Sequence, residues 1–115
     1  MKTITEHIRD HILLNAFGGS KATYKDSIDV IENDFSLDFV TKMANRIVMG
    51  HHRYGPVKNA KTDNIKAVKD RVGKYEETGN MEYLVDAGNF LMLEYHFPKH
   101  PKAHFESVDD GEHAT

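Results

Sequence analysis

The amino-acid sequence predicts a small all-α protein, a bundle of about four helices. Apolar side chains recur every three or four residues in several segments, which is the spacing of one helical face. A serine, threonine or aspartate precedes three of these segments, and the links between them are short. At 115 residues the chain has the length of a single domain.

The first predicted helix begins at Thr3, which can form a capping-box pair with Glu6. Its apolar face is made of isoleucines spaced four residues apart, namely Ile4, Ile8 and Ile12. Gly18-Gly19 is expected to end it, because glycine adopts the left-handed turn that follows many helices. Residues 20–34 are ambiguous, since their apolar residues fit a short helix, an irregular segment or a β-strand.

The second helix is predicted to begin after Ser36 and to extend to about Met49, with Gly50 as its end. Its apolar arc consists of Phe39, Val40, Met43, Ala44, Ile47 and Val48. Residues 51–59 are then expected to form a loop, because Gly55-Pro56 interrupts them and no helical periodicity continues.

Asp63 is predicted to cap a third helix, which extends to about Glu77. Its buried side would carry Ile65, Val68, Val72 and Tyr75. The link Thr78-Gly-Asn is so short that the fourth helix, 81–96, should fold back antiparallel to the third. We therefore expect one helical domain over residues 1–106, followed by an acidic flexible tail over 107–115.

The fourth helix is apolar on nearly every face, which is typical of a central, buried helix. A chain with so few helices has little to cover it with, so we predict a homo-oligomer. The start of the chain has no long apolar run, so neither a signal peptide nor a membrane partner is expected. The absence of cysteine excludes disulfides and thiolate metal sites and fits a cytoplasmic location.

Charge is distributed unevenly along the chain. Residues 42–74 hold nine lysines and arginines against two carboxylates, and both flanking regions are acidic. One interpretation is that neighbouring helices compensate each other. The other is a basic face for phosphate groups beside an acidic face for a divalent metal. The acidic total and the absence of a recognition-helix pattern argue against a nucleic-acid partner.

A polar stripe runs along the fourth helix. Glu82, Asp86 and Asn89 are spaced so that they share one side of a helix that is otherwise apolar. In one interpretation Glu82 is exposed in the first turn and Asp86 pairs with a lysine or arginine of the third helix. In the other, Glu82 and Asp86 are ligands of Mg²⁺ or Mn²⁺, with further oxygens from Glu76 and Glu77.

The basic region offers candidate contacts for a phosphate-bearing ligand. Arg53 and Tyr54 could hold a phosphate and stack on a base, although a solvated loop anchored by Tyr54 would show the same pattern. Lys58 lies in the same segment. Arg71 is on the helix expected to pack against Asp86, where it could bridge the carboxylate or a ligand phosphate.

Four stretches within roughly residues 46–110 carry a resemblance, namely Arg53-Tyr-Gly, 64–71, the run from Lys74 to Tyr95, and 98–105. They resemble a family of small uncharacterised phage and prophage helical proteins, which implies the cytoplasm of an infected or lysogenic bacterium as the location. A weaker similarity, of Glu82-Tyr-Leu-Val-Asp86, is to the MazG-like all-α nucleotide pyrophosphohydrolases. The order in which Arg-Tyr-Gly, an arginine, an asparagine and Glu-Tyr follow one another resembles the order of such residues in the amino-terminal domain of phage dATP/dGTP diphosphohydrolases.

The MazG-like similarity implies that Glu82 and Asp86 bind a metal and that Asn89 faces the nucleotide. Two positions depart from that pattern: Asn80 stands where the upstream motif has its third acid, and Tyr83 where the downstream motif has its second glutamate. We therefore expect a function in nucleotide binding or nucleotide-pool hydrolysis, with catalysis left open. The alternative is a non-catalytic phage protein that inhibits a host defence system by binding a nucleotide signal or a host protein.

Overall fold

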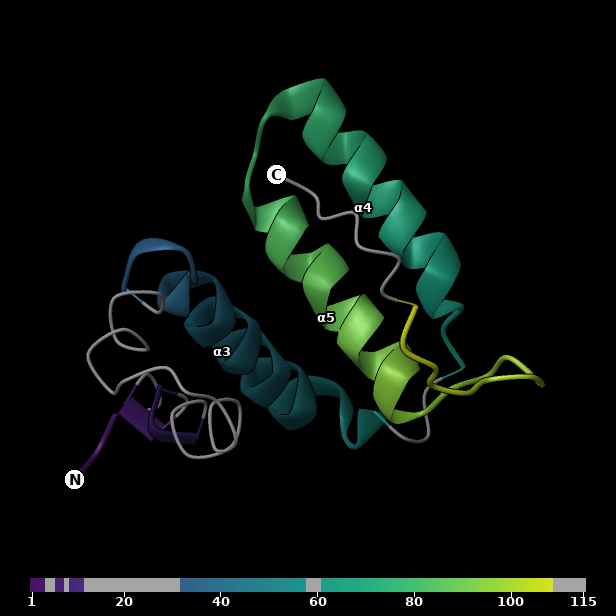
Figure 1. The fold of residues 1–115 in the computed structure, drawn as a ribbon. Coiled ribbons are helices and arrows are strands. Elements are labelled where there is room, and N and C mark those ends of the chain that lie inside the picture. Colours follow the sequence, from purple (N-terminus) through teal and green to yellow (C-terminus); the bar gives the residue numbers. More distant parts are fainter. Residues whose placement is uncertain (4–5, 8, 12–31, 58–60, 109–115) are drawn as a thin grey trace.

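The computed structural model describes residues 1–3, 6–7, 9–11, 32–57 and 61–108 (Figure 1). Within these ranges the only regular secondary structure is helical, which confirms the small all-α bundle. Its principal helices are α3 (Leu37–Tyr54), α4 (Asn64–Thr78) and α5 (Glu82–His96). Residues 20–31 of the segment predicted as irregular or β lie outside the described residues, and residues 32–33 are helical.

Thr3 caps the first helical segment as predicted. The Glu6 backbone N–H donates to Thr3 Oγ1 over 3.1 Å, and the His7 N–H donates to the Thr3 carbonyl over 3.0 Å. These bonds satisfy N–H groups that have no partner within the first turn of a helix. The expected apolar face at Ile4, Ile8 and Ile12, and the expected end at Gly18-Gly19, lie outside the described residues.

Helix α3 begins as predicted but extends further. Ser36 Oγ accepts the Phe39 N–H at 3.0 Å, so the cap was correctly identified. The predicted end at Gly50 is wrong, because the helix continues through it to Tyr54. A glycine inside a helix costs only about 1 kcal/mol, which the packing of neighbouring turns can offset. The helix ends instead at Gly55, whose φ of 80° favours glycine and which precedes Pro56.

Helices α4 and α5 form the predicted antiparallel hairpin (Figure 1). Asp63 Oδ1 accepts the Lys66 N–H at 3.1 Å at the start of α4. Gly79, at φ 73°, ends α4, and the Asn80 side chain accepts the Glu82 N–H at 3.0 Å to begin α5. The chain therefore reverses over three residues, 79–81, which is why the two helices lie side by side.

Helix α5 lies between α3 and α4, and the best-buried side chains of the described chain sit along it (Figure 1). Val85, Ala87 and Asn89 are buried on α5, and Asn64 is buried at the start of α4. Where α3 crosses α5, Gly88 provides the room: a Cβ built there would lie 2.9 Å from Phe39 Cζ and 3.2 Å from Met43 Sδ.

We predict that Gly88→Val destabilises the fold by about 2 kcal/mol, because the added isopropyl group would push Phe39 and Met43 off α5. The matched change is Gly73→Val, on α4, where a Cβ would meet nothing within 4 Å. Valine is a better helix former than glycine, so this change should be neutral or slightly stabilising. Urea unfolding of both variants measures the difference. Equal midpoints would show that α3 does not pack on Gly88 as described.

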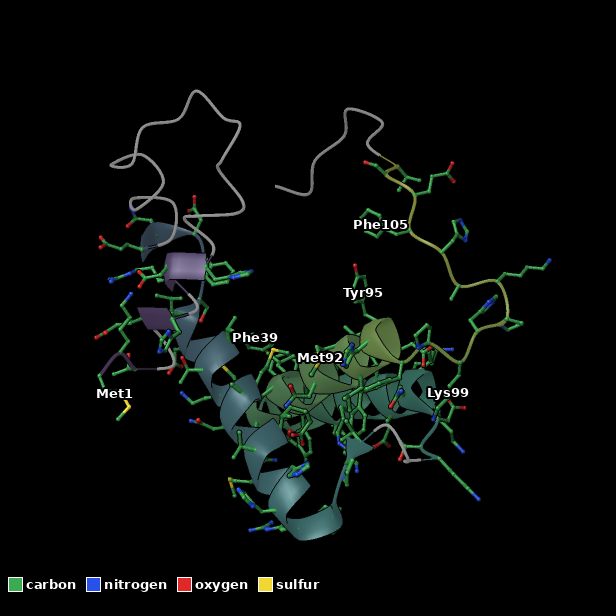
Figure 2. The ribbon with its side chains drawn as sticks, turned by 90° about the horizontal axis from the view of Figure 1, so that it is seen from below. Met1, Phe39, Met92, Tyr95, Lys99 and Phe105 are labelled. Carbon is green, nitrogen blue, oxygen red and sulfur yellow. The ribbon has the colours of Figure 1, made fainter. Side chains whose placement is uncertain are left out.

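An apolar face of the α4–α5 hairpin is exposed. Ile65 and Val72 were expected on the buried side of α4 but are 44% and 39% exposed. On α5, Leu91 and Tyr95 are also exposed, so this helix is central without being covered all round. Tyr95 projects away from the helices, toward the side on which Phe105 lies (Figure 2). The periodicity predicted which apolar residues share a helical face. The neighbouring helices cover only part of each face, because α5 has one partner on either side and α4 packs mainly on α5.

The C-terminal segment leaves the hairpin after Phe97. All residues from Pro98 to Val108 are exposed, including Phe105, and 109–115 lie outside the described residues. The domain boundary predicted at residue 106 therefore stays a prediction. None of α3, α4 and α5, the longest helices of the described ranges, combines the length and apolar character that crossing a membrane requires.

Candidate functional site

A cleft of about 1030 Å³ lies where the C-terminal half of α3 faces the hairpin, and we call it the α3–α5 cleft. Its walls come from α3, the turn at 55–57, the starts of α4 and of the C-terminal segment, and the inner side of α5. Of the candidate ligand-binding residues, Arg53, Tyr54, Arg71 and Asn89 all line it. Lys58 lies outside the described residues.

Arg46 of α3 joins the two carboxylates of the α5 polar stripe. Its Nη1 lies 2.6 Å from Glu82 Oε1, and its Nη2 lies 3.0 Å from Asp86 Oδ1. The hydrogen bond to Asp86 raises the pKa of Arg46 above its usual value, and the nearby charges of Asp86 and Glu82 add to this effect. Sequence reasoning missed Arg46, although it stands three residues after Met43 and therefore on the stripe of α3 that meets α5.

Arg71 approaches Asp86 from α4. Its Nε lies 3.7 Å from Asp86 Oδ2, and its Nη1 is also paired with the neighbouring Asp70. The guanidinium lies over the Phe90 ring, 5.5 Å from its centroid, which adds a cation–π contact. Asp86 is therefore held between arginines of two different helices. The partner expected from α4 is present, and a nearer one comes from α3.

Asn89 holds α5 to the backbone of α3. Its Nδ2 donates to the Met43 carbonyl over 3.1 Å, and the side chain is buried. Its Oδ1 is fully enclosed and accepts no hydrogen bond from the described residues. The Met43 carbonyl can only accept, so it determines which way the amide points. A buried acceptor without a donor is costly, which is typical of a site with a further partner.

Arg53 and Tyr54 lie in the last turn of α3 rather than in the predicted loop. Both are exposed at the rim of the cleft. Within the described ranges the Arg53 guanidinium makes no ion pair, in contrast to Arg46 and Arg71. Arg53 is thus a cation without an ion pair to any described residue, at the entrance of the cleft.

A second polar cluster lies beside the cleft, near the end of α5 and the start of α4. Glu94 of α5 accepts the Asn64 amide at 3.3 Å and the Lys99 backbone N–H at 2.8 Å. The Lys99 Nζ donates to the Thr62 carbonyl, which ties the C-terminal segment to the approach to α4. The Lys99 N–H is the main reason that the pKa of Glu94 lies below its usual value, and Asn64 contributes, while burial opposes the shift.

We predict that Glu94→Gln removes part of the acid sensitivity of the fold. A lowered pKa in the folded state means that the Glu94 carboxylate stabilises the fold above its unfolded pKa of 4.5, and that this contribution is lost as pH falls through the lowered folded value. The variant should melt a few degrees below wild type at pH 7 and at nearly the same temperature at pH 3. Glu77→Gln, an exposed carboxylate on α4, is the control. A melting difference that is the same at both pH values would contradict the prediction.

The proposed metal ligands do not all come together. Glu82 and Asp86 share Arg46, whereas Glu76 and Glu77 are exposed in the last turn of α4. The described part of the chain contains no group of three or more histidine or carboxylate side chains placed to hold a metal ion. Mg²⁺ and Mn²⁺ require several oxygen ligands, and here both candidate carboxylates already contact a guanidinium. This donor set does not fit such an ion well.

The cleft combines positive charge with aromatic surface. Arg46, Arg53, Arg71 and Lys99 line it, and Asp86 is the one carboxylate among its described lining residues. Tyr54, Phe90 and Phe97 also lie on its walls. Guanidinium groups bind phosphate through paired N–H donors, and aromatic rings stack on planar ligands. The site can therefore hold an anion that carries a planar ring.

No family model, curated protein or solved structure matches this chain. The relationships to phage proteins and to nucleotide pyrophosphohydrolases stay predictions from the resemblance.

Proposed function

We propose that this protein binds a nucleotide, or a similar phosphate-bearing ligand with a planar ring, in the α3–α5 cleft. The observation that carries the proposal is the composition of one cleft of about 1030 Å³, which has four cationic side chains, one carboxylate and several aromatic rings. A cavity of this size holds a drug-sized ligand.

The phosphate end of the ligand is assigned to Arg53 and the two arginines behind it. Arg53 is exposed and unpaired among the described residues, so it can contact an incoming anion without breaking an ion pair. Arg46 and Arg71 both line the cleft and contact the two oxygens of Asp86. Arginine rather than lysine at these positions suits bidentate recognition of phosphate.

The ring of the ligand is assigned to the aromatic wall. Tyr54 is 84% exposed beside Arg53, and a stacked base would cover part of its ring. Stacking of a base on an aromatic side chain contributes about 1–3 kcal/mol and tolerates any base. The identity of the base would then depend on the polar groups of the wall.

A thermal-shift titration tests the proposal. Nucleoside mono-, di- and triphosphates are added to the protein in EDTA, and the same series is repeated with Mg²⁺ and with Mn²⁺. A ligand at 100 times its Kd stabilises the folded state by about 2.7 kcal/mol, which is readily visible as a rise in Tm. If no nucleotide at millimolar concentration raises the Tm in any buffer, the proposal is wrong.

The same titration bears on the metal. A metal held by Glu82 and Asp86 would have to displace Arg46 from both carboxylates. Stabilisation by nucleotide that appears only with Mg²⁺ or Mn²⁺, together with phosphate release, would support a pyrophosphohydrolase. Stabilisation that is equal in EDTA would support binding without metal-dependent chemistry, as in a protein that captures a nucleotide signal.

Self-association and a host-protein partner stay predictions. The exposed apolar side chains of Ile65, Val72, Leu91 and Tyr95 support an interaction through the hairpin, because exposed apolar surface is often covered by a partner. Light scattering at micromolar concentration would distinguish a monomer from a homo-oligomer.

A further inference from the structure

Asp86 occupies an unusual place for a carboxylate in an anion-binding cleft. Its two oxygens contact arginines from different helices, Oδ1 at 3.0 Å from Arg46 Nη2 and Oδ2 at 3.7 Å from Arg71 Nε. It also lines the α3–α5 cleft itself. A carboxylate and a phosphate present similar oxygens to a guanidinium. Asp86 thus contacts the N–H donors that a ligand phosphate would use.

Neither arginine depends on Asp86 alone for neutralisation. Arg46 is also paired with Glu82, at 2.6 Å, and Arg71 with Asp70. Glu82 and Asp70 do not line the cleft, so the other acid of each arginine lies beyond its wall. Of the three carboxylates in this network, Asp86 is therefore the one that lines the cleft.

We propose that Asp86 competes with the ligand for Arg46 and Arg71 and thereby makes the cleft select polyphosphates over monophosphates. This inference rests on the proposed function. A single phosphate group beside Asp86 meets a like charge within a few ångströms, and that repulsion offsets much of its attraction to the two arginines. If Asp86 instead turns aside, its contacts with both arginines are lost, which also weakens binding.

A di- or triphosphate can engage cations that Asp86 does not contact. Arg53 and Lys99 both line the cleft, and neither contacts Asp86 among the interactions of the described residues. A longer anion therefore gains attraction while meeting the same single repulsion. Specificity of this kind comes from an unfavourable contact with the wrong ligand rather than from extra affinity for the right one.

Calorimetric titration of wild type and Asp86→Asn in EDTA tests the inference, with pyrophosphate, inorganic phosphate and nucleoside mono- and triphosphates as ligands. Asp86→Asn should bind monophosphates about tenfold more tightly and triphosphates by a smaller factor, so the preference for triphosphates shrinks. Glu76→Gln removes the same charge from an exposed position outside the cleft and should leave the preference unchanged. The titration is then repeated with Mn²⁺ in place of EDTA. A metal-ligand role for Asp86 predicts the opposite sign there, namely weaker binding by the variant than by wild type.

A measurement on the wild-type protein covers the case in which Asp86→Asn does not fold. Carboxyl-detected ¹³C NMR should show the Asp86 Cγ resonance moving as pyrophosphate is added, with Glu76 Cδ as the unmoved reference. If Asp86→Asn binds monophosphates no more tightly than wild type, or if the Asp86 resonance stays still while pyrophosphate binds, Asp86 is not a competitor. If no ligand binds to either protein, the proposed function itself is wrong.

Discussion

Replacement of Arg46 by methionine is expected to lower the free energy of unfolding by about 2 kcal/mol and the Tm by roughly 8 °C. Arg46 contacts two carboxylates that stand one turn apart on α5, Glu82 and Asp86. Without the guanidinium these like charges repel each other, and α3 loses its ionic connection to α5. The effect is smaller than for a fully buried pair, because the Arg46 side chain is 40% exposed.

The control for Arg46→Met is Lys42→Met on the same helix. Among the described residues Lys42 pairs with Asp38 alone, one turn away on α3, and both side chains are exposed, so its loss should cost less than about 0.5 kcal/mol. Methionine retains much of the aliphatic stem in both variants, which separates charge from packing. Adding Glu82→Gln and Asp86→Asn to Arg46→Met should recover part of the lost stability. If Arg46→Met and Lys42→Met melt alike, the network does not hold α3 to the hairpin.

The largest effect on binding is expected from Arg53→Gln, which should weaken nucleotide binding about tenfold to a hundredfold. A charge-assisted contact to phosphate contributes roughly 1.5–3 kcal/mol, and Arg53 has no competing ion pair among the described residues. Because its side chain is exposed and holds no other helix, the Tm of the free protein should stay within a degree or two. Titration calorimetry and thermal melting measure the two quantities separately.

Lys66→Gln is the matched control for Arg53→Gln. It removes the same charge from an exposed position on α4 that does not line the cleft. Its effect on affinity should be limited to the weak long-range term that salt screens. Equal loss of affinity in the two variants at 0.15 M salt would mean that the basic region attracts the ligand without a defined site. That outcome would contradict the assignment of the phosphate to the rim of the cleft.

The amino-acid sequence determined the features that depend on neighbours along the chain. Thr3, Ser36 and Asp63 cap their helices as predicted, because a cap joins a side chain to a backbone N–H three residues away. The hairpin of α4 and α5 follows from the short link at 79–81. The polar stripe of Glu82, Asp86 and Asn89 also lies on one side of α5, as the helical repeat requires.

Only the tertiary structure decided what those features meet. Gly50 stays helical because the preference of one glycine is weak, while Gly55 before Pro56 combines two constraints that end the helix. Ile65 and Val72 are exposed because periodicity defines an apolar face but does not supply a partner to cover it. Arg46 meets Asp86 across forty residues of chain, and Arg53 shares a cleft with Arg71, because the crossing of α3 over α5 at Gly88 sets distances that no local rule contains.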